Sequence, residues 1–129
     1  MSKHKEDLDC LNELGKILKN KKLISKLSDV LFYAVYDTSD NECRYFSVLD
    51  RLATSVSKYS AKAALFDLKR GSLTGSTTPI QLDEDARRAF DVIELCLDIE
   101  ELHALEVLKT IALSALTKCF LRGKSVESK

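Results

Sequence analysis

Helix-breaking residues gather in one short segment of this chain, and that distribution limits the fold more than any other feature. The sequence contains four glycines and one proline. Two of the glycines and the proline lie between Gly71 and Pro79. Because glycine and proline disfavour helix interiors, the remaining segments are free to be helical. We therefore predict an all-α protein with two helical halves, 6–70 and 82–122, joined by a polar Gly/Ser/Thr loop at about 71–81.

Apolar residues recur at spacings of three and four before this loop, which is the pattern of amphipathic helices. Leucines at positions 8, 11, 14 and 18 predict a first helix over 6–18. The clearest pattern lies between residues 23 and 35 and predicts a second helix, which the turn-forming run 37–41 should end. A third helix is expected around Leu49, and Ser60 is expected to cap a fourth. The second pattern consists of Leu23, Ile24, Leu27, Val30, Leu31, Ala34 and Val35.

The second half predicts two further helices. The first opens with the carboxylates of 83–85, which suit a positive helix terminus. Its apolar face should hold Ala86, Ala89, Phe90, Ile93, Cys96 and Leu97. Asp98 and Glu101 resemble a capping box and predict a tight corner. The last helix should run from Leu102 to Gly123, and its wide apolar surface indicates a central position in the bundle.

Composition indicates one globular domain over 1–129. The chain is 45% hydrophobic and 31% charged, and its length suffices for a single core. No apolar run is long enough for a membrane span, and no secretory leader precedes the first helix. These features predict a cytoplasmic protein with no membrane association. A hairpin in the threonine-rich stretch 73–80 would be marginal alone.

The four cysteines form no paired motif, and we interpret them as reduced core residues of a cytosolic protein. Neither histidine is spaced from them as a metal ligand would be. We therefore expect no metal and no cofactor. The cysteines stand at positions 10, 43, 96 and 119, and the histidines at 4 and 103.

No catalytic constellation is evident. The segment Gly71–Ser76 lacks the Gly-Lys-Ser/Thr ending of a phosphate-binding loop. Consecutive carboxylates at a helix start do not converge on a metal, and His103, near Glu100, Glu101 and Glu106, has no evident catalytic partner in the sequence. We predict that the protein is not an enzyme.

Basic residues offer a better functional signal, although the net charge is zero. Lys16, Lys19, Lys22 and Lys26 crowd a short window, and the last three would share a face if the helices ran on. Phosphate backbones favour such clusters through counterion release. A solvated lysine surface is an equally good interpretation.

A second basic row consists of Arg44, Arg51 and Lys58, which are seven residues apart. On a continuous helix this spacing keeps side chains roughly aligned. With Tyr45 nearby, such a row could follow a nucleic-acid backbone and stack a base. Both lysine- and arginine-rich segments are therefore candidate nucleic-acid-binding sites.

The segment 45–53, with the sequence YFSVLDRLA, resembles a segment of the small subunit of type I-A CRISPR interference complexes. Ser57-Lys58 and the Ala/Leu run 61–65 are similar to its continuation, and 111–116 to its final alanine-rich helix. The resemblance covers about half of the chain. The acidic block and the N-terminal lysines have no counterpart in it.

This resemblance implies a small helical subunit with a variable insertion, which would correspond to 71–81. Copies would self-associate along the effector filament beside larger protein subunits, holding guide RNA and target DNA by their backbones. Asp50 would orient its helix by pairing with a basic neighbour, and Arg51 would contact the backbone. A different class of function fits the sequence as well: a helical adaptor that binds a partner helix in a groove, without nucleic acid.

Overall fold

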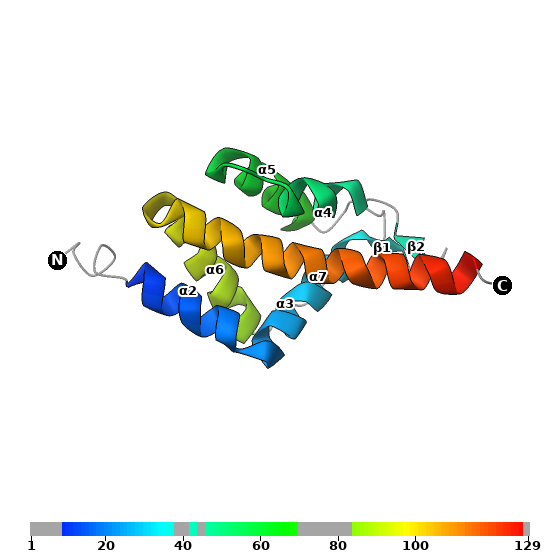
Figure 1. Ribbon diagram of the computed structural model, residues 1–129, viewed down its shortest axis with the longest axis horizontal. Helices are drawn as coiled ribbons and strands as arrows, with labels where there is room; N and C mark the ends of the chain where they lie inside the picture. Colours follow the sequence, from blue (N-terminus) through cyan, green and yellow to red (C-terminus); the bar gives the residue numbers. More distant parts are fainter. Residues whose placement is uncertain (1–8, 38–41, 44–45, 70–83, 128–129) are drawn as a thin grey trace.

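The computed structural model describes residues 9–37, 42–43, 46–69 and 84–127. The predicted loop at 71–81, the hairpin at 73–80 and residues 6–8 of the predicted first helix lie outside these residues. The described helix begins at Cys10, later than predicted, with Asp9 as its cap. Six helices make up nearly all of the described chain, as Figure 1 shows. Their bounds are α2 Cys10–Lys19, α3 Lys21–Val35, α4 Phe46–Ala53, α5 Lys58–Lys69, α6 Glu84–Ile99 and α7 Glu101–Glu127. The prediction of an all-α bundle of five or six helices is confirmed.

Helix α7 is the axis of the bundle. Its 27 residues make it roughly 40 Å long at the usual helical rise. It packs against α2, α3, α4, α5, α6 and β2, and in Figure 1 α2 and α3 lie on one side of it with α4 and α5 on the other. The predicted central position of the last helix is confirmed. Its predicted end at Gly123 is wrong, because the helix continues through this glycine to Glu127.

One asparagine forms the corner between α2 and α3. The N–H of Asn20 donates to the carbonyls of Lys16 and Ile17, while its side-chain oxygen accepts from the N–H of Leu23 at 3.1 Å. Asn20 thus closes one helix and caps the next. The two helices do not run on, so the shared face expected for Lys19, Lys22 and Lys26 does not arise from helical spacing.

Helix α2 presents a different face to the core from the one predicted. Its buried residues are Cys10, Leu14 and Ile17, whereas Leu11 is 50% exposed and Leu18 37% exposed. The leucine stripe was the wrong register: the buried residues follow a second apolar stripe at i, i+4 and i+7, which starts at Cys10. Cys10 on this face is bonded to α6.

The four cysteines form two disulfides, Cys10–Cys96 and Cys43–Cys119. The interpretation of reduced core thiols is therefore wrong, although Cys10, Cys96 and Cys119 are buried as expected. Sequence spacing could not reveal the pairing, since the partners are 86 and 76 residues apart. Each bond closes a long loop through the fold.

A two-stranded antiparallel ladder, which the sequence did not predict, follows α3. Strand β1, Tyr36–Asp37, pairs with β2, Glu42–Cys43, with Tyr36 opposite Cys43. The pair brackets the predicted turn at 37–41, of which 38–41 lie outside the described residues. The Cys43–Cys119 disulfide fastens this ladder to α7.

The capping predictions for α5 and α7 are wrong in detail. Ser57, rather than Ser60, caps α5: its hydroxyl oxygen accepts from the N–H of Ser60 at 3.4 Å. The carboxylate of Glu101 accepts from the N–H of Lys58 at 2.7 Å. Glu101 therefore stabilises the start of α5 from another helix, while Asp98 pairs with lysines. The corner itself is present, because α6 ends at Ile99 and α7 begins at Glu101.

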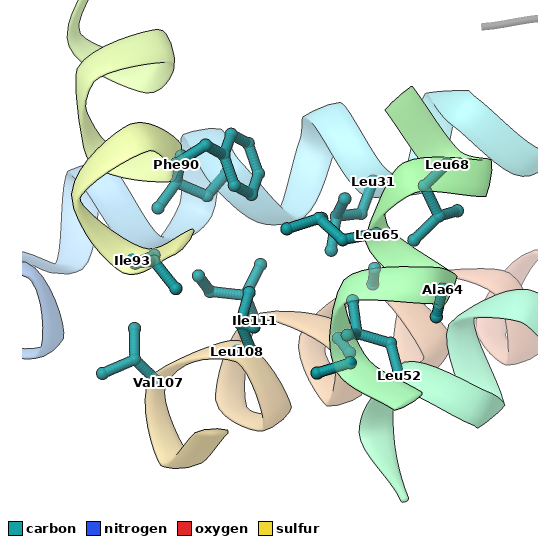
Figure 2. Packing of buried hydrophobic residues seen from close by; sticks show 14 of the residues in the cluster. Leu31, Leu52, Ala64, Leu65, Leu68, Phe90, Ile93, Val107, Leu108 and Ile111 are labelled. Carbon is teal, nitrogen blue, oxygen red and sulfur yellow. The ribbon is translucent and has the colours of Figure 1, made fainter. Parts of the chain in front are cut away.

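One hydrophobic core draws on both halves of the chain. Figure 2 shows Leu52, Leu65, Phe90 and Ile111 meeting from α4, α5, α6 and α7. The apolar faces predicted for α6 and for the inner side of α5 are buried as expected. Leu102, Leu113 and Phe120 are instead more than half exposed, so the apolar surface of α7 is wider than its core contact.

Candidate nucleic-acid interface

A hollow of about 460 Å³ lies where α2, α3 and α6 meet. We call it the basic groove. Helix α2 contributes Glu13, Lys16 and Ile17, and the corner contributes Asn20. Helix α3 adds Lys22, Leu23 and Lys26, and α6 adds Asp85, Arg88, Ala89 and Val92. Three helices from both halves of the chain therefore build one site.

Cations outnumber carboxylates around the basic groove. Lys16, Lys22, Lys26 and Arg88 face two acids, so the formal charge of its lining is +2. The Lys16 Nζ lies 3.8 Å from Glu13, and the Lys26 Nζ lies 3.9 Å from Asp85. Both pairs are long and solvent-exposed, which makes them weak. Such loose pairs can exchange for a bound anion.

Lys22 and Arg88 differ from the other two cations. Neither has an ion-pair partner within the described residues. Both are exposed. Their positive charges are therefore available to a ligand that enters the groove.

Between the charges the groove is lined by apolar side chains. Ile17 is buried in the core, and Leu23, Ala89 and Val92 lie beside it, buried or half-buried. Because apolar side chains bind water only weakly, the face of a sugar or base can pack against this floor. Charged walls over an apolar floor suit a ligand that carries both phosphate and apolar surface.

The predicted lysine window is thus partly assembled into a site. Lys16, Lys22 and Lys26 line the basic groove, brought together by the α2–α3 corner. Lys19 is exposed at the end of α2 and is not part of the lining. Arg88 is the residue that sequence reasoning missed. It stands with Arg87 in an otherwise acidic stretch, and helical spacing on α6 puts it beside Ala89 and Val92 but cannot relate it to α2.

The second predicted row is not continuous. Arg44 lies outside the described residues, and Arg51 and Lys58 lie on separate helices because α4 ends at Ala53. Arg51 donates to the carboxylate of Asp67 at 2.8 Å, which joins α4 to α5. Lys58 lies 3.3 Å from Asp98, which joins α5 to α6. Both side chains are partly exposed, but both already hold neighbouring helices together.

Asp98 is the centre of that second cluster. It accepts a hydrogen bond from Lys62 at 2.8 Å as well as pairing with Lys58. The hydrogen bond from Lys62, with a smaller one from Lys58, holds the pKa of Asp98 below its ordinary value of 3.8. The expected partner for Asp50 is not found within the described residues.

No group of three or more metal-ligating side chains converges in the described part of the chain. His103 is exposed and lies 3.4 Å from Glu100, its neighbour one turn away. None of the described helices combines the length and apolarity needed to cross a bilayer.

Comparisons with protein-family models, curated proteins and solved structures give no match to this chain.

Proposed function

We propose that this protein is a non-catalytic subunit that binds nucleic acid through the phosphate backbone, with the basic groove as its contact. The observation that carries the proposal is the convergence of four cations on one hollow with only two carboxylates. Phosphates are the biological anions most commonly bound by clustered Lys and Arg, and release of their counterions makes such binding favourable.

The groove suits contact with the backbone rather than recognition of bases. Lysine is a compact point charge that binds a phosphate from many directions, whereas base readout needs fixed bidentate donors. A lining charge of +2 matches one or two phosphates. A single chain should therefore bind weakly and without sequence preference, and several copies would be needed for a continuous track.

We further propose that the larger assembly is an RNA-guided effector complex of the CRISPR type, with a role in antiviral defence. The support is the resemblance of 45–53, 57–65 and 111–116 to a small subunit of such complexes. These segments belong to α4, α5 and the middle of α7, whereas the groove belongs to α2, α3 and α6. One side of the molecule would then contact larger subunits and further copies, while the other holds guide RNA or target DNA.

A cytoplasmic location is part of this proposal, and the disulfides attach a condition to it. Disulfides are rare in cytosolic proteins, but intracellular proteins of hyperthermophiles are an exception. We therefore propose a cytoplasm of that kind. If the host were a mesophile with a reducing cytosol, the two disulfides would instead imply that the protein is located in an oxidising compartment.

The test compares two charge-reversal variants that differ only in position. Lys22→Glu/Arg88→Glu reverses two groove cations. Lys21→Glu/Arg87→Glu reverses their exposed sequence neighbours, which lie outside the lining. Fluorescence anisotropy with a single-stranded oligonucleotide at about 50 mM salt should show a loss of roughly 10- to 100-fold for the groove variant. The neighbouring variant should lose much less.

Salt dependence provides a second readout. Each lost phosphate contact should reduce the slope of log affinity against log salt by about 0.7 for a single strand. Equal losses in both variants would mean that only overall charge matters, and the groove would no longer be the site. Absence of binding by the unmodified protein, alone and in an assembled complex, would end the nucleic-acid proposal.

The adaptor function remains a second candidate because of one observation on the other side of the molecule. Ala63 and Phe66 of α5 and Leu95 of α6 line a second hollow of about 580 Å³, rimmed by Lys62 and Glu94. Phe66 is 65% exposed. A Phe66→Asp variant that loses a protein partner but retains oligonucleotide affinity would favour the adaptor function.

A further inference from the structure

One of the two disulfides joins two walls of the basic groove. Cys10 begins α2 and Cys96 lies in the second half of α6, and they are bonded across 86 residues of sequence. Helix α2 supplies Glu13, Lys16 and Ile17 to the groove, and α6 supplies Asp85, Arg88, Ala89 and Val92. Neither cysteine lines the groove, but the covalent bond limits how far the two helices that carry its walls can separate.

Helix α2 is a short element that packs against α3, α6 and α7. It is ten residues long, shorter than helices that are stable alone in water. Its buried side chains are Cys10, Leu14 and Ile17, so the disulfide supplies one of three anchors. Elements with few buried contacts open most readily. Without the bond, α2 keeps the packing of these three short side chains but loses its covalent link to α6.

We infer that the basic groove binds its phosphate ligand strongly only when Cys10 and Cys96 are bonded. This inference rests on the proposed function of the groove. In the reduced protein α2 opens more often, and each opening removes Lys16 from the wall and Ile17 from the floor. The ligand then meets the cations of α3 and α6 alone.

The chemistry is thiol–disulfide exchange with a dithiol reductant. A thiolate of the reductant attacks one of the two sulfurs, which forms a mixed disulfide and releases the other cysteine as a thiol. The second thiol of the reductant then attacks this mixed disulfide and releases the remaining cysteine. Two electrons and two protons pass to the protein, giving two thiols, while the reductant becomes a disulfide. Cys10 is 2% exposed and Cys96 fully buried, so attack requires prior opening of α2. Reduction must therefore be carried to completion and checked by counting thiols.

The second disulfide offers a matched control. Cys43–Cys119 joins β2 to α7, and neither of its cysteines lines the groove. The two variants to compare are Cys10→Ala/Cys96→Ala and Cys43→Ala/Cys119→Ala. Alanine is chosen because a buried serine would need a hydrogen-bond partner. Circular dichroism checks that each variant keeps the helical content of the unmodified protein.

Oligonucleotide affinity is measured for all three proteins before and after complete reduction by dithiothreitol. We expect reduction to weaken the unmodified protein and the Cys43/Cys119 variant about fivefold or more, from the loss of one phosphate contact. The Cys10/Cys96 variant should be weak in both states and insensitive to dithiothreitol. If it keeps the affinity of the oxidised protein, or if reduction has no effect on the unmodified chain, the inference is wrong.

This outcome is distinguishable from failure of the proposed function. A protein that binds through Lys22 and Arg88 but ignores its redox state would contradict the inference alone. A protein that binds no oligonucleotide while fully oxidised would contradict the proposed function itself. A variant that loses its helical content is replaced by reduction of the unmodified protein, for which the same affinity comparison decides.

Discussion

Two clusters of lysine and arginine side chains on this molecule differ in the carboxylates that surround them. In the basic groove, Lys22 and Arg88 have no ion-pair partner within the described residues, while the pairs of Lys16 with Glu13 and of Lys26 with Asp85 are long, at 3.8 and 3.9 Å. On the α4–α5 side, Arg51, Lys58 and Lys62 each lie within 3.3 Å of an aspartate on another helix. The first cluster can receive an anion, while the second already has its counter-charges.

The comparison teaches that a basic residue becomes a binding residue through what the fold puts opposite it. From sequence spacing, Lys22 and Lys58 were predicted alike as nucleic-acid-binding residues. Tertiary structure gives Lys58 the carboxylate of Asp98 and gives Lys22 an open hollow. Binding through Arg51 or Lys58 remains a prediction, but a ligand there would have to displace an intramolecular pair.

The largest expected effect comes from removing the support that both clusters share. Leu108 is fully buried on α7, which packs against the helices of both sides. Leu108→Ala should lower the free energy of unfolding by about 2–5 kcal/mol, because a leucine-sized cavity remains in the core. Chemical denaturation measures this loss. Leu113→Ala, on an exposed position of the same helix, should change stability by less than about 0.5 kcal/mol.

An intermediate effect should appear at Asp98 as a dependence on pH. Its pKa is lowered in the folded protein, so ionised Asp98 favours folding. This stabilisation is fully present above its ordinary value of 3.8 and is lost as the pH falls through the lower folded pKa. The stability difference between the unmodified protein and Asp98→Asn should therefore be constant near neutral pH and shrink in acid.

Thermal unfolding at several pH values measures that difference. Asp91→Asn is the matched control, because Asp91 is exposed on the same helix and has no ion pair within the described residues. A difference for Asp98→Asn that does not vary with pH, or one equal to that of the control, would show that the Lys58–Asp98–Lys62 cluster contributes nothing to the fold. The contrast between the two basic clusters would then be lost.

Local pattern was sufficient for most of the fold. The apolar faces of α3, α5 and α6 were correctly predicted because their buried residues repeat at helical spacing without interruption. The buried face of α2 was predicted wrongly because two apolar stripes overlap in its sequence, and the one through Cys10, which bonds to Cys96 86 residues away, is the buried one. The capping of α5 by Glu101 was missed because no local pattern contains a bond between residues distant in sequence. The predicted helix end at Gly123 was wrong for another reason: a glycine permits a helix to end but does not require it to end.

The candidate site was less predictable than the fold. The lysine window was visible in the sequence, but its convergence depends on the Asn20 corner and on α6 packing across it. Arg88 carries no signal of its own in an acidic stretch. The row Arg44, Arg51 and Lys58 looked equally convincing because spacing of seven implies alignment only on an unbroken helix. The break at 54–57 removed that premise.

The smallest expected effect tests whether the ligand lies in the basic groove at all. Asp85 competes for Lys26 across 3.9 Å, and its side chain is 76% exposed. Asp85→Asn raises the lining charge from +2 to +3 and removes a carboxylate that competes with a bound phosphate. At roughly 10 Å in water one added charge is worth about 0.4 kcal/mol, so oligonucleotide affinity should rise about twofold at low salt.

Glu84→Gln makes the same change of charge one residue earlier, outside the lining and also in the first turn of α6. A ligand seated in the groove should distinguish the two variants, because only Asp85 faces it. Equal gains would mean that the strand responds to the overall field of the protein, and the groove would then have no claim over the rest of the basic surface.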